Sequence, residues 1–188
     1  MADTQIILEK YWGHSSFRPL QKEIIESVLE AKDTLAILPT GGGKSICFQV
    51  PGLAKDGLCL VVSPLIALMK DQVENLKKRG IPALLIHSGM SRADVVQTLK
   101  NATNKYFKFL YVSPERLETS LFKEFLPAID VNLIAVDEAH CISQWGYDFR
   151  PSYLRIAELR KELPGVPLLA LTASATEDVQ VDVCEKLT

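Results

Sequence analysis

Short apolar runs alternate along the chain with longer segments in which apolar residues recur every three or four positions. A short apolar run bounded by turn residues is typical of a buried strand, and the longer spacing is typical of an amphipathic helix. The pattern predicts strands at residues 34–38, 58–63, 83–87, 107–113, 132–137 and 168–173. It predicts helices at residues 24–32, 65–80, 93–102, 153–163 and 177–187.

This alternation predicts the fold class. Strands joined by helices form right-handed crossovers, which place the strands parallel and the helices on both faces of the sheet. We therefore expect an α/β fold in which a mainly parallel sheet is sandwiched between helices, as in RecA-like P-loop NTPase domains. The 188 residues suit one such domain. Ligands of these sheets bind beyond the carboxyl ends of the strands, so the residues after each strand are the candidates for chemistry.

The composition restricts the possible functions only slightly. The net charge of −2 lacks the basic excess of many nucleic-acid binders. A protein that holds a phosphate backbone through loop amides and helix N-termini needs no such excess, so nucleic acid stays possible. The four cysteines include no CxxC pair, and no zinc site is indicated. No signal peptide or apolar run of membrane-spanning length is present, which favours an intracellular protein, cytoplasmic or nuclear, without a membrane partner.

A glycine loop follows the first predicted strand and precedes the helix-like residues 46–50. Glycines let backbone amides turn toward phosphate oxygens, and the helix directs its positive dipole end at the same anion. We predict a site for ATP in which Lys44 reaches the phosphates and Ser45 ligates Mg²⁺. The first glycine of the usual pattern is Leu38 here, and a plain glycine turn is the alternative. The predicted loop residues are Thr40, Gly41, Gly42, Gly43, Lys44 and Ser45.

Two carboxylates end the predicted strand at residues 132–137. Asp137 fits an acid that holds Mg²⁺, and Glu138 fits the base that polarises the attacking water. Two acids at a strand end can instead simply face solvent. With the glycine loop upstream, the sequence favours catalysis by Lys44, Asp137 and Glu138, while the role of His140 stays open.

Residues 137–140 read DEAH and resemble the second motif of superfamily 2 helicases. The segment from Cys141 to Tyr153, here called the aromatic segment, resembles the aromatic-rich loop of RecQ helicases. Aromatic rings stack on bases, and Arg150 can contact a phosphate, so the resemblance implies DNA contact and coupling by Trp145, Phe149 and Arg150. The alternative is that these rings pack in the core. The family commonly has His where this chain has Tyr147.

The residues FRPLQ, from Phe17, resemble the family motif that contacts adenine, which implies that Arg18 and Gln21 bind the nucleotide. The nearby His14 is more typical of an ordinary surface residue.

Segments beginning at Ser63, Tyr111 and Leu171 resemble motifs Ia, Ib and III of the family. Ser63 and Ser113 follow strands and precede prolines, where hydroxyls and amides can hold a DNA phosphate, and both also suit helix N-caps. Motif III usually reads Thr-Ala-Thr, whereas residues 172–174 read Thr-Ala-Ser.

Taken together, the resemblance identifies residues 1–188 with the N-terminal ATP-binding lobe of a RecQ-type, ATP-dependent DNA helicase. It implies single-stranded and duplex DNA as partners, translocation from 3′ to 5′, and a second lobe elsewhere in the parent chain. The zinc-binding and winged-helix regions of the family are absent from this sequence. Because hydrolysis in this class needs an arginine finger from the second lobe, we expect the isolated lobe to be nearly inactive. An RNA helicase lobe and a binding module that never hydrolyses ATP are the alternatives.

Overall fold

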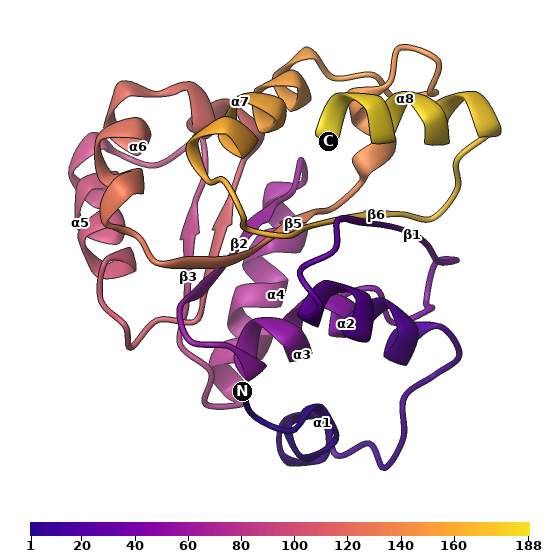
Figure 1. The fold of residues 1–188 in the computed structure, drawn as a ribbon. Helices are drawn as coiled ribbons and strands as arrows, with labels where there is room; N and C mark the ends of the chain where they lie inside the picture. Colours follow the sequence, from indigo (N-terminus) through magenta and orange to yellow (C-terminus); the bar gives the residue numbers. More distant parts are fainter.

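A computed structural model describes residues 1–188 as one six-stranded sheet covered by helices on both faces (Figure 1). All neighbouring strands are parallel, in the order β1-β6-β5-β2-β4-β3. The predicted fold class, a RecA-like α/β sandwich, is confirmed. The strands are β1 (Thr34–Ile37), β2 (Leu58–Val62), β3 (Ala83–Ile86), β4 (Phe109–Val112), β5 (Val131–Val136) and β6 (Leu168–Thr172).

The helices divide by position in the chain, with α1 to α4 on one face and α5 to α8 on the other (Figure 1). Those of the first face are α1 (Thr4–Trp12), α2 (Gln21–Leu29), α3 (Ile46–Ala54) and α4 (Ile66–Lys78). Those of the second are α5 (Arg92–Ala102), α6 (Ser120–Phe125), α7 (Arg155–Glu162) and α8 (Glu177–Leu187). Short 3₁₀ helices η1 to η4 span Pro114–Glu118, Leu126–Ala128, Ala139–Ile142 and Pro151–Leu154.

Burial on both faces explains the continuous apolar runs of the central strands. In β2 every residue is buried, but Leu58, Leu60 and Val62 face the α5–α8 side while Cys59 and Val61 face the α2–α4 side. Successive side chains of a strand point to opposite faces, so a strand covered on both sides has no polar position.

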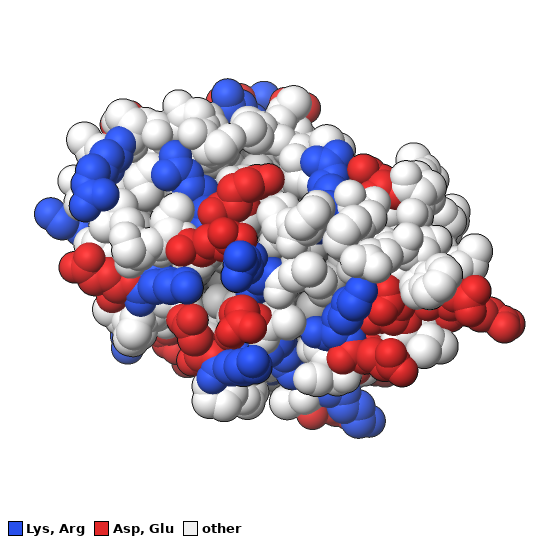
Figure 2. Space-filling view, turned by 90° about the horizontal axis from the view of Figure 1, so that it is seen from above, with Lys and Arg blue, Asp and Glu red and all other residues white.

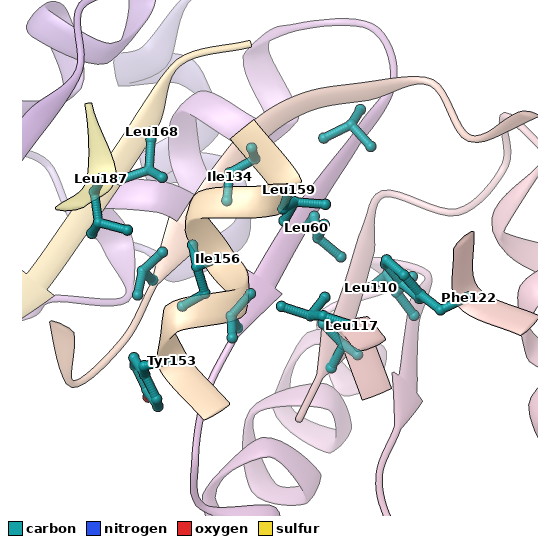
Figure 3. Close-up of a cluster of buried hydrophobic side chains, with 14 of the residues drawn as sticks. Leu60, Leu110, Leu117, Phe122, Ile134, Tyr153, Ile156, Leu159, Leu168 and Leu187 are labelled. Atoms are coloured by element: carbon teal, nitrogen blue, oxygen red, sulfur yellow. The ribbon is translucent and has the colours of Figure 1, made fainter. Parts of the chain in front are cut away.

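The α5–α8 side holds the larger core. Ile156 and Leu159 of α7 reach toward the sheet around Ile134 and Leu60, with Tyr153 of η4 just before the helix (Figure 3). These side chains are almost fully buried. Burying such a side chain contributes roughly 1.5 to 3 kcal/mol, so this contact fixes the position of the segment that leads into α7.

Element boundaries differ from expectation at several places. The helix expected at 24–32 ends at Leu29 because Ala31 adopts a left-handed conformation with φ of 60°. The helix expected from Tyr153 begins at Arg155, after η4. Helix α1 was not predicted; the Asp3 carboxylate caps its first amides, and Gly13 closes it with φ of 70°. None of these shifts alters the order of the strands.

The register of the sheet brings together the residues that follow the strands. Ile37 pairs with Thr172, and Val62 pairs with both Val136 and Val112. The segments after β1, β6, β5, β2 and β4 therefore emerge side by side at one edge. No helix has the length and apolar character needed to cross a membrane.

Candidate functional site

The glycine loop lies between β1 and α3, as the sequence predicts. Gly41 and Gly43 have φ values of 80° and 76°, in the left-handed region that favours glycine. A Cβ on Gly42 would lie 2.8 Å from the Pro39 carbonyl oxygen. Side chains are thus disfavoured at all three positions, and glycine leaves the backbone open to a close approach by a ligand.

Arg18 and Gln21 fasten this loop to the start of α2. The Arg18 Nη1 donates to the Gly41 carbonyl at 2.6 Å, and the Gln21 Nε2 donates to the Gly43 carbonyl at 3.0 Å. The Gln21 Oε1 accepts from the Arg18 backbone amide at 2.8 Å, so both ends of this buried amide are engaged. The Gln21 Nε2 keeps a second hydrogen and its Oε1 a second lone pair, with which the side chain can meet an adenine edge while it holds the loop.

Asp137 and Glu138 follow β5 and face the glycine loop. The Asp137 Oδ1 accepts from the Glu138 amide at 3.0 Å, while the Tyr153 hydroxyl donates to the Asp137 carbonyl oxygen at 2.8 Å. Glu138 has φ of 52°, a conformation that non-glycine residues rarely adopt. Such strain persists only where the surrounding structure imposes it, and here it turns the chain sharply after the strand.

The charge around Asp137 favours a cation. Burial raises the pKa of Asp137, the neighbouring Glu138 carboxylate raises it further, and Lys44 and the Glu138 amide oppose this rise. A buried carboxylate beside a second acid gains from a positive ion that offsets its charge. The hydroxyl of Ser45 lines the same cavity, and hydroxyl and carboxylate oxygens are the ligands that Mg²⁺ prefers. These donors fit the predicted metal.

His140 joins the acidic box, which is Asp137 and Glu138, to the end of β6. Its Nδ1 lies 2.8 Å from the Thr172 Oγ1 and 3.4 Å from the Glu138 Oε2, and its ring stacks on Tyr147 at 4.7 Å between centroids. Burial lowers the pKa of His140, against the pull of Glu138 and Asp148, so the ring is held neutral. The motif III residue Thr172 and the aromatic segment thus meet at one buried ring.

One cavity of about 800 Å³ contains most of the predicted nucleotide site. This volume lies within the range of small-molecule sites. Tyr147, Phe48, Leu68 and Gln72 also line the cavity but were not predicted for it, because nothing in their local sequence points to it. The predicted residues that line it are Arg18, Gln21, Thr40, Gly41, Gly43, Lys44, Ser45, Asp137 and Glu138, and His14 lies there too.

Ser63 and Ser113 lie at the ends of the neighbouring strands β2 and β4. The Ser63 amide donates to the Val112 carbonyl at 3.2 Å, which places the two serines side by side. Both hydroxyls are buried and lack a hydrogen-bond partner. Neither acts as a side-chain cap: α4 has Leu65 at its N-cap, and Ser113 precedes η1 without a capping bond.

The aromatic segment divides into exposed and half-buried rings. The side chains of Trp145 and Tyr147 are 75% and 77% exposed, so neither belongs to the core. Phe149 and Arg150 are half-buried, and the Arg150 guanidinium bonds the Asp148 carboxylate at 3.2 Å. Figure 2 shows basic and acidic side chains interspersed on one face, without a continuous basic expanse. Binding of a polyanion would therefore depend on local groups.

His140, Cys141 and Asp148 place their ligand atoms within 4.8 Å of one another. The His140 Nδ1 is engaged by Thr172, and the Asp148 carboxylate by Arg150. Burial raises the pKa of the Cys141 thiol to about 12, so the thiol stays protonated, whereas metals bind the thiolate. The cluster is better described as part of the hydrogen-bond network under the aromatic segment.

Residues 18–181 match the family model described as DEAD/DEAH box helicase. The chain is 49% identical over 185 residues to the ATP-dependent DNA helicase RecQ of Bacillus subtilis, covering 97% of this chain and 31% of that protein. It is 46% identical over 187 residues to the probable ATP-dependent DNA helicase RecS of the same organism, covering all of this chain and 38% of that protein. The chain thus spans about a third of the length of these curated relatives.

Solved structures share the fold. The helicase domain of Hef from Pyrococcus furiosus superposes with a TM-score of 0.70 at 25% identity, covering 90% of this chain and 36% of that one. The DUF1998 helicase MrfA bound to DNA superposes with a TM-score of 0.76 over the whole chain and 28% of its own. At 15% identity, the second similarity concerns the fold alone.

Proposed function

The chain belongs to the DEAD/DEAH box helicase family, and we propose that it is the ATP-binding motor lobe of a RecQ-type DNA helicase. In this proposal the complete protein couples ATP hydrolysis to movement along single-stranded DNA and to duplex unwinding. The observation that carries the proposal is that Lys44, Ser45, Asp137 and Glu138 line one cavity together with Tyr147 of the aromatic segment. The segment that contacts nucleic acid would then also line the nucleotide site.

The residues of the cavity suit hydrolysis of a nucleoside triphosphate. Lys44 and the loop amides would offset the phosphate charge, and Ser45 and Asp137 would hold Mg²⁺, which when bound would neutralise charge on the phosphates. Glu138 accepts a proton from the attacking water. The neutral ring of His140 contacts both Glu138 and Thr172, so a shift of β6 would reach the base through this ring.

DNA would lie along the adjoining part of the same edge. The hydroxyls of Ser63 and Ser113 are unpartnered but buried, so a shift of the segments after β2 and β4 that exposes them would let them donate to backbone phosphates without sequence preference. The exposed ring of Trp145 offers a stacking surface for a base, and Phe149 and Arg150 support it from the same segment. An intracellular location goes with a DNA substrate.

A complete motor needs a second lobe in this proposal. Motors of this class close two lobes over ATP, and an arginine finger raises the rate by roughly 10³ to 10⁵. The isolated lobe is then nearly inactive although it binds nucleotide. The 3′ to 5′ direction comes from the likeness to RecQ proteins.

The deciding experiment measures ATP hydrolysis by the complete two-lobed protein with single-stranded DNA, with RNA of the same sequence, and without nucleic acid. We expect strong stimulation by DNA and little by RNA. Stronger stimulation by RNA would favour an RNA helicase, and no hydrolysis under any condition would favour a nucleotide-dependent binding module. Either outcome contradicts the proposed function.

A further inference from the structure

Helix α8 contacts the beginning of the aromatic segment. The Lys186 Nζ donates to the Ile142 carbonyl at 3.2 Å and to the Asp182 Oδ2 at 3.0 Å. Ser143 is fully buried, and its hydroxyl accepts from the Trp145 backbone amide at 3.2 Å. Ile142 is thus tied to α8 and Ser143 to Trp145, so the beginning of the segment is not a free loop.

Asp182 is the centre of this contact. Burial acts to raise its pKa, but hydrogen bonds from the Ser143 hydroxyl, from Lys186 and from the Gln144 backbone amide together lower it. The carboxylate is 15% exposed and stays charged at neutral pH. Hydrogen bonds to an ionised acceptor are stronger than neutral ones, so the charge of Asp182 strengthens the contact between α8 and the segment, which Lys186 bridges to Ile142.

The ring of Trp145 extends from this fixed backbone. Trp145 lines a groove with Asp178, Val181, Asp182 and Glu185 of α8, yet its side chain is 75% exposed. Two residues before Ile142, His140 is fixed by Thr172 at the end of β6. Since Thr172 leads within five residues into α8, motion of β6 can reach the aromatic segment at both points.

We propose that Asp182 is a positioning residue, which holds the Ser143–Trp145 backbone so that nucleic acid bound at Trp145 can accelerate hydrolysis at Glu138. The inference rests on the proposed function, because it assumes that the aromatic segment contacts nucleic acid. It goes beyond it by assigning a role to α8, which has no part in the nucleotide cavity. Asp182 touches neither nucleotide nor nucleic acid and acts through Trp145.

The first test measures the mobility of Trp145 in the 188-residue chain. The chain has two tryptophans, so Trp12→Phe leaves Trp145 as the only emitter. In that background, with excitation selective for tryptophan over the five tyrosines, we expect Asp182→Ala to enlarge the fast component of the time-resolved anisotropy decay. Asp182→Asn, which keeps an acceptor oxygen but loses the charge, gives a smaller change. Glu185→Gln, an exposed carboxylate of the same groove, leaves the decay unchanged.

The second test measures DNA stimulation of hydrolysis in the complete protein. Asp182→Ala should reduce the stimulation by about tenfold or more with the basal rate and the nucleotide KM unchanged, because misplacing a contact by about 1 Å can cost up to a hundredfold. Asp182→Asn has the volume of the native residue and serves if the alanine variant fails to fold.

Each outcome decides the inference. An unchanged anisotropy decay in the Asp182 variants overturns it, and so does unchanged stimulation in a variant whose Trp145 has become mobile. A loss of melting temperature with neither change would show a merely structural role. Absence of stimulation in the wild type counts against the proposed function instead. The anisotropy measurement then still decides whether Asp182 fixes Trp145.

Discussion

The Nδ1 atom of His140 lies 2.8 Å from the Oγ1 atom of Thr172, which joins the loop after β5 to the last residue of β6 inside the protein. Both side chains are buried. A buried polar atom that loses its partner costs about 1 to 3 kcal/mol. The pair therefore contributes to stability as well as linking the acidic box to motif III.

Replacing the hydroxyl tests this pair. We expect Thr172→Val to lower the free energy of unfolding by roughly 1 to 3 kcal/mol, because the His140 Nδ1 loses the Thr172 hydroxyl and keeps only the Glu138 Oε2 at 3.4 Å. Urea unfolding of the 188-residue chain measures the change. Thr103→Val, at an exposed helix end, should stay within about 0.5 kcal/mol of the wild type. Equal losses in the two variants would contradict a specific role for the pair.

Asp137 gives the chain a pH dependence of definite sign. Its pKa is raised in the fold, chiefly by burial and then by Glu138, so the folded chain binds this proton more tightly than the unfolded chain does. The ionised carboxylate therefore destabilises the nucleotide-free chain above the folded pKa, and the penalty fades as the pH falls through it. We expect Asp137→Asn to raise the melting temperature at pH 7, with an advantage that shrinks on acidification. A lower melting temperature at pH 7 would show that the charge is already compensated.

Glu138 should separate binding from chemistry. In the complete protein we expect Glu138→Gln to bind ATP almost as the wild type does and to hydrolyse it about 10² to 10⁴ times more slowly, since an amide cannot take the proton. Single-turnover kinetics and nucleotide titration measure the two effects. Glu177→Gln, at the exposed start of α8, is the matched control. Loss of binding equal to the loss of rate would make Glu138 a structural residue.

Trp145 should affect function more than stability. Because its side chain is 75% exposed, Trp145→Ala should change the melting temperature little, whereas half-buried Phe149 should cost more when truncated. DNA stimulation in the complete protein should fall, since stacking on an aromatic ring contributes roughly 1 to 3 kcal/mol per base. Tyr106→Ala removes an equally exposed ring just before β4, at the opposite edge of the sheet, and should leave stimulation intact. Equal stimulation in the two variants would remove Trp145 from the DNA contact.

The sequence predicted the sheet because strands buried on both faces appear in it as short, continuous runs of apolar residues. All six strands fall where the apolar runs lie, and the glycine loop and the acidic box meet because parallel strands end at one edge. Helix α1 escaped prediction because its apolar face is narrow, with only Ile7 and Leu8 buried. The capping Asp3 was the one local signal that could have indicated it.

The contacts that tune the site could not be predicted. Tyr153 reaches the Asp137 carbonyl, Thr172 reaches His140, and Asp182 reaches the residues before Trp145, all across distances in sequence that no local pattern encodes. Gln21, predicted to meet an adenine edge, also bonds Arg18 and Gly43, and the local sequence did not indicate these contacts. The packing of the elements decides such partners, and the order of the strands does not determine that packing.

The most direct test of the nucleotide site is a calorimetric titration of Mg·ADP into the 188-residue chain and into its Lys44→Ala variant. We expect measurable binding by the wild type and a loss of roughly tenfold to a hundredfold or more in the variant, because hydrogen bonds to a charged group contribute about 1.5 to 3 kcal/mol. Lys105→Ala, an exposed lysine before β4, should bind as the wild type does. If Lys44→Ala bound Mg·ADP with the affinity of the wild type, the cavity between the glycine loop and the acidic box would not be the nucleotide site.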